Sequence, residues 1–441
     1  IISDRTNDNP YENLLFEATE TKQSLEEIIA AIRTAKNDDR IKGIYLKTGV
    51  MHTGYASLEE IRKALQDFQT SGKFIYSYSG SYTQGAYYVA SVSDSVFLNP
   101  MGVLDLHGVS SSSMFYKHLL DTLGVEMQVI KVGTYKSFTE QYTNDTMSSE
   151  NKEQVTRLVS TLWNELSSSI SKSRKLELEW MDSLANDMIT YKMPTQSLKA
   201  GLIDGLLYSD EVEKTLKNRL SVAEDDDLNL VSLQDYYNIE ISGSTVQKSA
   251  PHVAILYLEG EIDNGNQDGI SSSKTMKEIE KLRKDENVKS VVVRVNSPGG
   301  SAYGAEQIWH AIEELKKSKP VTVSMGNYAA SGGYYLSAGA NRIFANNNTI
   351  TGSIGVFSVI PNLEGLMNKL GVKTQVVKTN PYADLLGNVA RPLDEHEKEV
   401  LQEHVGEVYD MFLTRCSKGR SMPKPDVEKV AEGRVWVGQD A

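Results

Sequence analysis

Cysteine is almost absent from this chain of 441 residues, because Cys416 is the single one, which excludes a disulfide framework and a zinc site built on thiolates. The seven histidines show neither HExxH nor HxH spacing, so the sequence predicts no metal site and no cofactor. No apolar run approaches the ~18–20 residues that a membrane helix needs. Basic residues are also few, with 46 Lys and Arg against 59 Asp and Glu, and the net charge of −13 argues against nucleic-acid binding. The length predicts two to four domains.

The two halves of the chain resemble each other at a constant shift of 247 residues. The matching blocks are Leu123–Lys131 with Leu370–Lys378, Gly85–Tyr88 with Gly332–Tyr335, and Gly43–Lys47 with Ser290–Arg294. This pattern predicts a tandem duplication, with an N-terminal repeat at 1–215, an acidic and polar linker at 216–250, and a C-terminal repeat at 251–441.

Within the second copy, β-branched apolar runs alternate with amphipathic segments. The expected strands are Val253–Gly260, Val288–Val295, Pro320–Met325 and Arg342–Phe344, and the expected helices are Ala305–Lys317, Ala329–Ala338 and Asn362–Leu370. A further long helix is expected at Ser149–Leu176, as an extension of the first copy beyond this core. The alternation predicts an α/β fold with mostly parallel sheets covered by helices.

Both ends of the chain look trimmed when the two copies are aligned. Matching Ile2–Asp4 with Glu261–Asp263 leaves the first copy without a counterpart of the strand Val253–Gly260, and the second copy stops at Ala441 where the first copy continues. We therefore expect a fragment of a longer protein, so its lack of a membrane anchor says little about the native protein.

Residues suited to catalysis occur where the two copies differ. Gly299 and Gly300 end a strand before a helix, where close backbone approach and free N–H groups suit an oxyanion hole. Ser331 lies between small residues at the next strand-to-helix turn, which is typical of an exposed nucleophile. The first copy has His52 in place of Gly299 and Gln84 in place of Ser331.

A nucleophilic serine needs a base, and a lysine with a lowered pKa is an accepted alternative to histidine. Lys136 of the first copy is aligned with Ala383 of the second copy. The losses are thus complementary, since one copy keeps the lysine and the other keeps the serine. This pattern predicts one active site built from both repeats.

Four motifs resemble those of signal peptide peptidase A, also called protease IV, in its long duplicated form. They are NSPGGS (296–301), NYAASGGYY (327–335), TGSIGV (351–356) and VGTYKS (132–137), and the resemblance covers nearly the whole chain. It implies a Clp-protease/crotonase-like fold and a homotetramer anchored in the bacterial cytoplasmic membrane, with its catalytic body on the extracytoplasmic, periplasmic side. It also implies that released signal peptides are the substrates, and this chain then resembles a soluble fragment that lacks the anchor.

Carried over by motif, the resemblance implies that Ser331 is the nucleophile of a serine endopeptidase and that Lys136 is its general base. Ser353 would orient the lysine, and the first copy has Leu106 there. The oxyanion hole would be formed by amides of Gly299 or Gly300 and of Gly332.

Three other interpretations compete with this one. A crotonase-type acyl-CoA hydratase or isomerase shares the fold, but a Ser/Lys pair split across repeats would have no use there. A catalytically inactive scaffold or binding module does not explain why both Ser331 and Lys136 remain. A Ser-His-Asp peptidase of the Clp type would need one of the histidines as its base.

Overall fold

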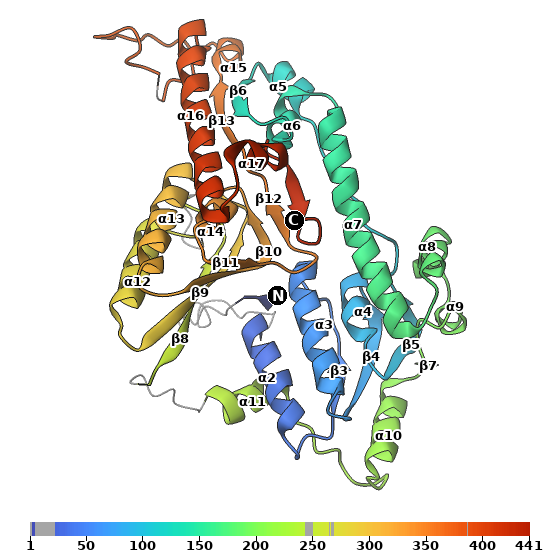
Figure 1. The fold of residues 1–441 in the computed structure, drawn as a ribbon. Coiled ribbons are helices and arrows are strands. Elements are labelled where there is room, and N and C mark those ends of the chain that lie inside the picture. Colours follow the sequence, from blue (N-terminus) through green and yellow to red (C-terminus); the bar gives the residue numbers. More distant parts are fainter. Residues whose placement is uncertain (1, 5–22, 243–249, 264, 266–268, 386) are drawn as a thin grey trace. The chain divides into compact units, whose positions relative to one another are not determined.

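The computed structural model describes residues 2–4, 23–242, 250–263, 265, 269–385 and 387–441, which form two compact units (Figure 1). Unit 1 holds residues 1–109, 161–250 and 346–348, and unit 2 holds residues 110–160, 251–345 and 349–441. The units are therefore not consecutive stretches of sequence. In particular, residues 110–160 fold with the second half of the chain.

The sheet of unit 1 is parallel throughout. Its strand order is β3 (Gly43–Lys47), β4 (Phe74–Tyr82), β5 (Ser95–Leu104) and β7 (Gly205–Leu206), and β1 (Ile2–Ser3) forms a separate parallel pair with β2 (Gln23–Ser24). The helices are α2 (Leu25–Asn37), α3 (Tyr55–Gln69), α4 (Gln84–Ala90), α8 (Leu178–Asn186), α9 (Pro194–Lys199), α10 (Ser209–Leu220) and α11 (Leu233–Tyr237), with short turns at Ile189–Tyr191 and Asn238–Ser242.

Local sequence explains where these helices begin and what they bury. Ser24 caps α2 in a capping box with Glu27, which satisfies backbone N–H groups that have no partner inside the helix. The apolar faces of α2 and α3 then pack against the sheet, and Leu65, Phe68 and Ile75 are fully buried in the resulting core.

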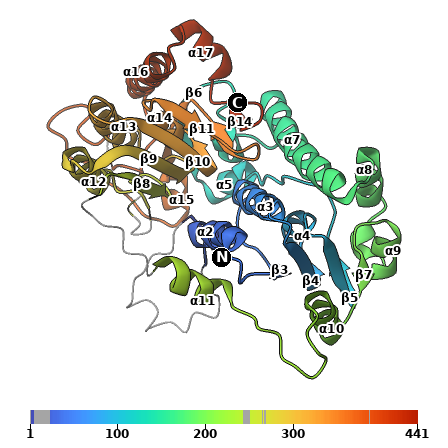
Figure 2. The ribbon, with the colours of Figure 1, turned by 60° about the horizontal axis from the view of Figure 1, so that its bottom comes forward.

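Unit 2 contains a larger sheet of the same kind. Its order is β14 (Val435–Val437), β12 (Ile350–Gly352), β10 (Val321–Ala330), β9 (Val288–Ser297) and β8 (His252–Glu259), and β11 (Arg342–Phe344) also pairs with β10. All pairs are parallel except that of β12 with β14. Figure 2 shows α12 (Ser272–Lys284) and α13 (Ala302–Lys316) side by side along this sheet. The predicted α/β class with mostly parallel sheets is confirmed.

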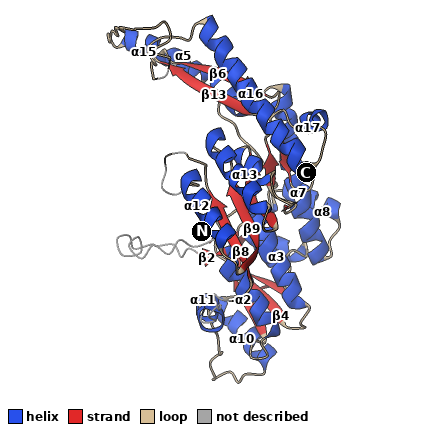
Figure 3. Cartoon of the chain, turned by 60° about the vertical axis from the view of Figure 1, so that its left-hand side comes forward, coloured by secondary structure: helices blue, strands red, loops and turns tan. Residues whose placement is uncertain are grey.

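A second element of unit 2 is a two-stranded antiparallel ribbon. It joins β6 (Glu126–Val132) to β13 (Val356–Asn362), and α16 (Glu395–Arg420) packs along it (Figure 3). The remaining helices are α5 (Lys117–Leu123), α6 (Glu140–Thr143), α7 (Ser149–Arg174), α14 (Gly332–Ser337), α15 (Glu364–Lys369) and α17 (Lys424–Val430), with a short turn at Ser137–Thr139. The last residues of α7 belong to unit 1.

The element bounds repeat at the shift seen in the sequence. Adding 247 to the bounds of α2 and α3 gives those of α12 and α13, and β4 likewise maps onto β10. The long α7 maps within one residue onto α16, so it is a repeated element and not an extension of one copy. The fold is therefore a duplicated one, as the sequence predicts.

The contacts of the first residues match Ile2 with Ile262, one residue away from the alignment of Ile2–Asp4 with Glu261–Asp263. The Ile2 N–H donates to the His52 carbonyl, and the Ile262 N–H donates to the Gly299 carbonyl, which is the counterpart of His52. Among the described residues of unit 1, the sheet has β3 at one edge and no counterpart of β8.

Several boundaries shift by a few residues from their predictions, and the one at Ser331 matters for the site. The helix expected from Ala329 begins only at Gly332, because Ala329 and Ala330 continue β10 and pair with Thr351 and Gly352 of β12. Two strands thus extend to the same level and leave Ser331 directly at the turn.

Candidate active site

Ser331 lies at the junction between β10 and α14, in a backbone conformation that is rare for any residue other than glycine. Its φ is 53° and its ψ is −121°. The Ser331 N–H donates to the Gly352 carbonyl at 2.9 Å, which fixes the turn to β12. Space at the turn is tight, since a Cβ on Gly333 would lie 2.7 Å from the Ser297 carbonyl oxygen. Small residues flank Ser331 because nothing larger fits there.

Lys136 reaches this serine from the segment that follows β6. The side chain is buried, and its Nζ donates to Ser331 Oγ at 3.2 Å. The same Nζ donates to Ser353 Oγ at 3.0 Å and to the Ser353 carbonyl at 3.2 Å. The three residues singled out in the sequence therefore meet, and all of them belong to unit 2.

The environment of the Lys136 amine is apolar as well as closed. Burial lowers the pKa of Lys136 to about 8, because removing the ammonium from water disfavours the charged form. The ring of Phe357 lies beside the amine, with its centroid 5.7 Å from Nζ. About one tenth of this lysine is thus neutral at pH 7, and a neutral amine can accept a proton.

The three glycines expected at an oxyanion hole surround Ser331. The Gly299 N–H donates to Ser297 Oγ at 3.2 Å, whereas the Gly300 N–H has no hydrogen-bond partner among the described residues. Gly300 has a φ of 140°, and a Cβ there would lie 2.4 Å from the Ile262 carbonyl oxygen. Gly332 is the first residue of α14, where backbone N–H groups lack intrahelical acceptors. The contacts thus distinguish the two neighbouring amides, which the sequence cannot do.

Three further residues hold the lysine, and the sequence analysis missed them. A Cβ on Gly433 would lie 2.7 Å from the Lys136 Cβ, and a Cβ on Gly355 would lie 3.2 Å from its Cδ. Gln154 of α7 donates to the Tyr135 carbonyl at 3.0 Å and to Ser137 Oγ at 2.8 Å, so it binds both neighbours of Lys136. Gly355 lies within the TGSIGV motif, but nothing in the local sequence of Gln154 or Gly433 marks them.

The corresponding place in unit 1 is filled by a glutamine. Gln84 is buried, its Oε1 accepts the N–H groups of His107 and Gly108, and its Nε2 donates to the Tyr55 hydroxyl. Leu106, at the position of Ser353, is fully buried. The side chains here bond to their own unit and offer no nucleophile.

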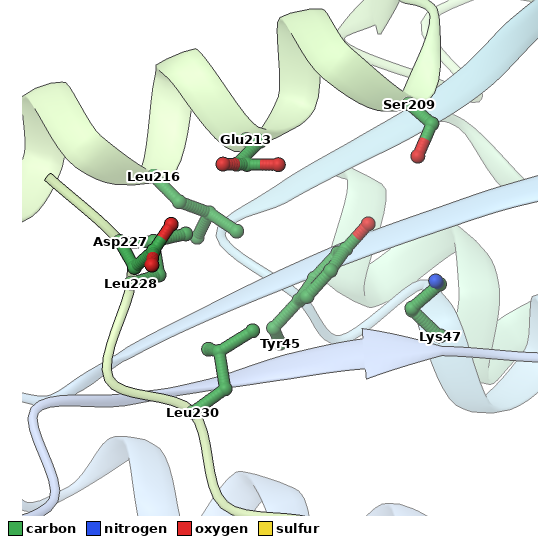
Figure 4. Close-up of a pocket in the computed structure, with 8 residues that line it drawn as sticks. All are labelled: Tyr45, Lys47, Ser209, Glu213, Leu216, Asp227, Leu228 and Leu230. Atoms are coloured by element: carbon green, nitrogen blue, oxygen red, sulfur yellow. The ribbon is translucent and has the colours of Figure 1, made fainter. Parts of the chain in front are cut away.

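Unit 1 also contains a cavity of about 440 Å³, shown in Figure 4. Carboxylates, one lysine, one serine and apolar side chains line it, namely Tyr45, Lys47, Ser209, Glu213, Leu216, Asp227, Leu228 and Leu230. None of the residues selected from the sequence lies in it.

Metal-binding clusters and membrane-spanning helices are both absent from the described part of the chain. No group of three or more His, Cys, Asp or Glu side chains is arranged to hold a metal ion there. No helix among these residues is both long enough and apolar enough to cross a membrane.

A serine at a strand-to-helix turn of a mostly parallel α/β fold is typical of serine hydrolases. The sequence model of Peptidase family S49 matches residues 67–223 and 313–441, and that of Clp protease matches residues 244–351. The chain belongs to peptidase family S49 and is a serine peptidase.

Similar proteins carry related names. Protease 4 of Haemophilus influenzae is 34% identical over 95% of this chain and 70% of its own length. The chloroplastic serine protease SPPA of Arabidopsis thaliana is 32% identical over 95% of this chain and 62% of its own length. The putative signal peptide peptidase SppA of Enterococcus faecium is 35% identical over 47% of this chain and 62% of its own length.

Proposed function

We propose that this serine peptidase is an endopeptidase that uses Ser331 as nucleophile and Lys136 as general base. The observation that carries the proposal is the distance of 3.2 Å between Lys136 Nζ and Ser331 Oγ, which lets the lone pair of the neutral amine accept the hydroxyl proton. Neutral Lys136 accepts the hydroxyl proton while Ser331 Oγ attacks the carbonyl carbon of a peptide bond. The lowered pKa supports this role, because an ammonium group has no free electron pair to accept a proton.

The tetrahedral intermediate places a negative charge on the former carbonyl oxygen. We assign the Gly300 and Gly332 amides to this oxyanion, because the Gly299 N–H already donates to Ser297. Protonated Lys136 then donates its proton to the leaving amine, and the acyl-enzyme forms. Lys136 next takes a proton from the water that attacks the acyl carbon, and it returns this proton to Ser331 Oγ as the acyl group leaves, which restores both residues.

Ser353 has a positioning role in this scheme. Both its hydroxyl and its carbonyl oxygen accept from Lys136 Nζ, so two of the three bonds of the amine orient it. The third bond points to Ser331. In terms of the predicted repeats 1–215 and 251–441, with the linker 216–250 between them, the first repeat supplies the lysine and the second supplies the remaining catalytic groups.

The substrates are proposed to be released signal peptides and other apolar peptides. The name of the Enterococcus faecium relative supports this class. Aromatic side chains beside the lysine support it as well, since Phe138 is exposed and its ring centroid lies 5.3 Å from that of Phe357. Such a surface favours apolar substrate side chains.

The resemblance carries two further proposals. The native protein is a homotetramer, and it is anchored in a bacterial cytoplasmic membrane with the catalytic body on the extracytoplasmic side. Light scattering of the purified chain tests the first, and protease accessibility in intact and opened cells that produce the native protein tests the second.

Hydrolysis of an apolar signal-sequence peptide tests the catalytic proposal. We expect Ser331→Ala and Lys136→Ala to abolish cleavage while the oligomeric mass stays unchanged. Gln84→Ser, made in the Ser331→Ala background, is a matched control that restores a serine at the unit 1 position. It should stay inactive, because no lysine amine bonds to that position among the described residues. Retained cleavage in Lys136→Ala would contradict the proposal and direct attention to the histidines.

A further inference from the structure

Two segments of unit 2, residues 110–115 and 373–378, are repeat counterparts of paired strands but form no strand themselves. The shift of 247 residues maps 110–115 onto residues 357–362 of β13, and 373–378 onto residues 126–131 of β6. In the ribbon these two stretches pair with each other residue by residue. Each strand of the ribbon therefore has an unpaired copy elsewhere in the same unit.

The backbone of both segments lacks hydrogen-bond partners within the described part of the chain. No backbone hydrogen bond joins residues 110–115 or 373–378 to another described residue. Apart from the half-buried Phe115, their side chains face solvent even where they are apolar, with exposed fractions of 70% for Met114, 48% for Val376 and 99% for Val377. Free N–H and C=O groups beside exposed apolar side chains are what an unpaired strand presents to another chain.

The glycines at the ends of α5 and α15 give a second, independent observation. Gly124 has a φ of 82° and packs against the second repeat of the same chain. A Cβ placed on Gly124 would lie 2.7 Å from the Gly365 carbonyl carbon. The Leu366 N–H donates to the Gly124 carbonyl at 2.7 Å. Gly371, the counterpart of Gly124, has nearly the same φ of 73°, yet nothing lies within 4 Å of a Cβ placed there.

The leucines around this second glycine are uncovered too. Leu119, the counterpart of Leu366, is 55% exposed, and Leu370 beside Gly371 is 71% exposed. The contact of Gly124 with Leu366 is thus made inside the chain. The corresponding contact of Gly371 with Leu119 is not made among the described residues, although both residues are exposed and available for it.

We propose that residues 110–115 of one copy of the chain pair with residues 373–378 of a second copy, antiparallel and in the register of β6 with β13. The register pair Val359 and Val129 then predicts that Ser112 lies opposite Val376. Gly371 of the second copy packs against Leu119 of the first. This deepens the proposed homo-oligomer by naming the segments that assemble it.

Such an interface is heterologous, because the two surfaces that meet are different. Each copy carries one of each, so every copy binds two neighbours, and the assembly closes into a ring when the rotation between neighbours permits. Because two different segments meet, no two-fold axis passes through the paired strands.

Disulfide formation between two different single variants tests the pairing. Chains carrying Ser112→Cys and Val376→Cys are produced together, purified through distinguishable tags and oxidised. Directly opposite residues of antiparallel strands lie ~4.5–5.5 Å apart between Cα atoms, within the range of a disulfide. We expect a covalent dimer that contains one chain of each kind. The native Cys416 is buried, so the unaltered chain stays monomeric on a denaturing gel.

Two controls keep the result decisive. Ser112→Cys with Val372→Cys is out of register by four residues, ~13 Å along the strand, and should not cross-link. Val129→Cys with Val359→Cys in one chain reports the internal pair and should cross-link without a change of mass. Efficient internal cross-linking without the Ser112–Val376 dimer would overturn the proposal, as would an intramolecular Ser112–Val376 bond in the double variant.

Assembly is also separable from catalysis. Val376→Pro removes an N–H that has no partner within the described chain, so it should leave the fold intact and reduce the mass to that of one chain. An oligomer that persists in this variant contradicts the pairing. If Val376→Pro loses assembly but still cleaves peptide, both the pairing and the Ser/Lys proposal are supported. If the cysteine variants cross-link but the protein cleaves no peptide, the Ser/Lys proposal alone is contradicted.

Discussion

The pH dependence of cleavage follows directly from the burial of Lys136. Only the neutral amine accepts the Ser331 proton, and burial lowers its pKa to about 8. At pH 6 about 1% of such a group is neutral, and at pH 8 about half is. The value of kcat/KM should therefore rise about 50-fold from pH 6 to pH 8 and less than about twofold from pH 8 to pH 10.

The position of the plateau decides between a buried and an ordinary lysine. A lysine with its usual pKa of ~10.4 would give a rate that still rises about tenfold per unit above pH 8. The assay is kcat/KM for a fluorogenic apolar peptide at constant ionic strength, with circular dichroism at each pH to confirm that the protein stays folded. A rate that does not change between pH 6 and pH 9 would refute the argument that Lys136 is the base.

A variant at Phe357 links the plateau to the structure. Phe357→Ala removes the ring that lies 5.7 Å from the amine and admits water, so the pKa and the onset of the plateau should move to higher pH. Val359→Ala on the same strand is the matched control and should leave the onset unchanged. Equal shifts in both variants would mean that β13 as a whole, and not the local dielectric, sets the pKa.

Four further results are expected at the same site. Lys136→Met should raise the free energy of unfolding by about 3 kcal/mol at pH 7 and by about 1 kcal/mol at pH 10. The reason is that the unfolded lysine stays protonated up to its usual pKa, whereas the folded one stays protonated only up to about 8. Denaturant unfolding at the two pH values measures this difference, and an equal gain at both would contradict it. Ser353→Ala removes the bond of 3.0 Å to the amine and should lower kcat about tenfold with little change in KM, and a change confined to KM would speak against a positioning role. Gly433→Ala forces a Cβ to within 2.7 Å of Lys136 at a φ of 78° and should lower both activity and the unfolding temperature, whereas full activity would show that the backbone can yield there. Gln154→Ala leaves the backbone around Lys136 without two of its bonds and should lower kcat and shift the onset of the pH plateau, while loss of stability with an unchanged pH profile would make Gln154 purely structural.

Much of the fold could be predicted because the tandem duplication gives two related sequences for the same elements. The shift of 247 residues places α2 and α3 onto α12 and α13 without error, and β-branched runs mark β9 and β10 by their composition alone. The boundary between β10 and α14 at Ser331 could not be predicted from the sequence. Alanine favours helix over strand, so the composition at Ala329 and Ala330 points to a helix, and their pairing with β12 decides that they are strand.

The candidate site divides in the same way. Ser331, Lys136 and Ser353 were selected by sequence because the repeats differ there and the motifs surround them, and these features are local. Distance is not local: Lys136 and Ser331 are 195 residues apart in the chain, and the pairing of β6 with β13 is one of the tertiary contacts that bring them together. The same holds for Gly433, which contacts Lys136 from a distant part of the chain, whereas Gln154 lies only 19 residues from Tyr135 and reaches it through the fold of α7.

By itself, then, the amino-acid sequence determined the α/β class, the duplication and the chemical nature of the reacting groups, because periodicity, repetition and residue type are written along the chain. Tertiary structure alone decided that residues 110–160 fold with the second half, that the Gly299 amide but not the Gly300 amide has a hydrogen-bond partner among the described residues, and that the Lys136 amine is buried. Each of these depends on which distant groups exclude water or supply a hydrogen-bond partner, and no local pattern encodes that.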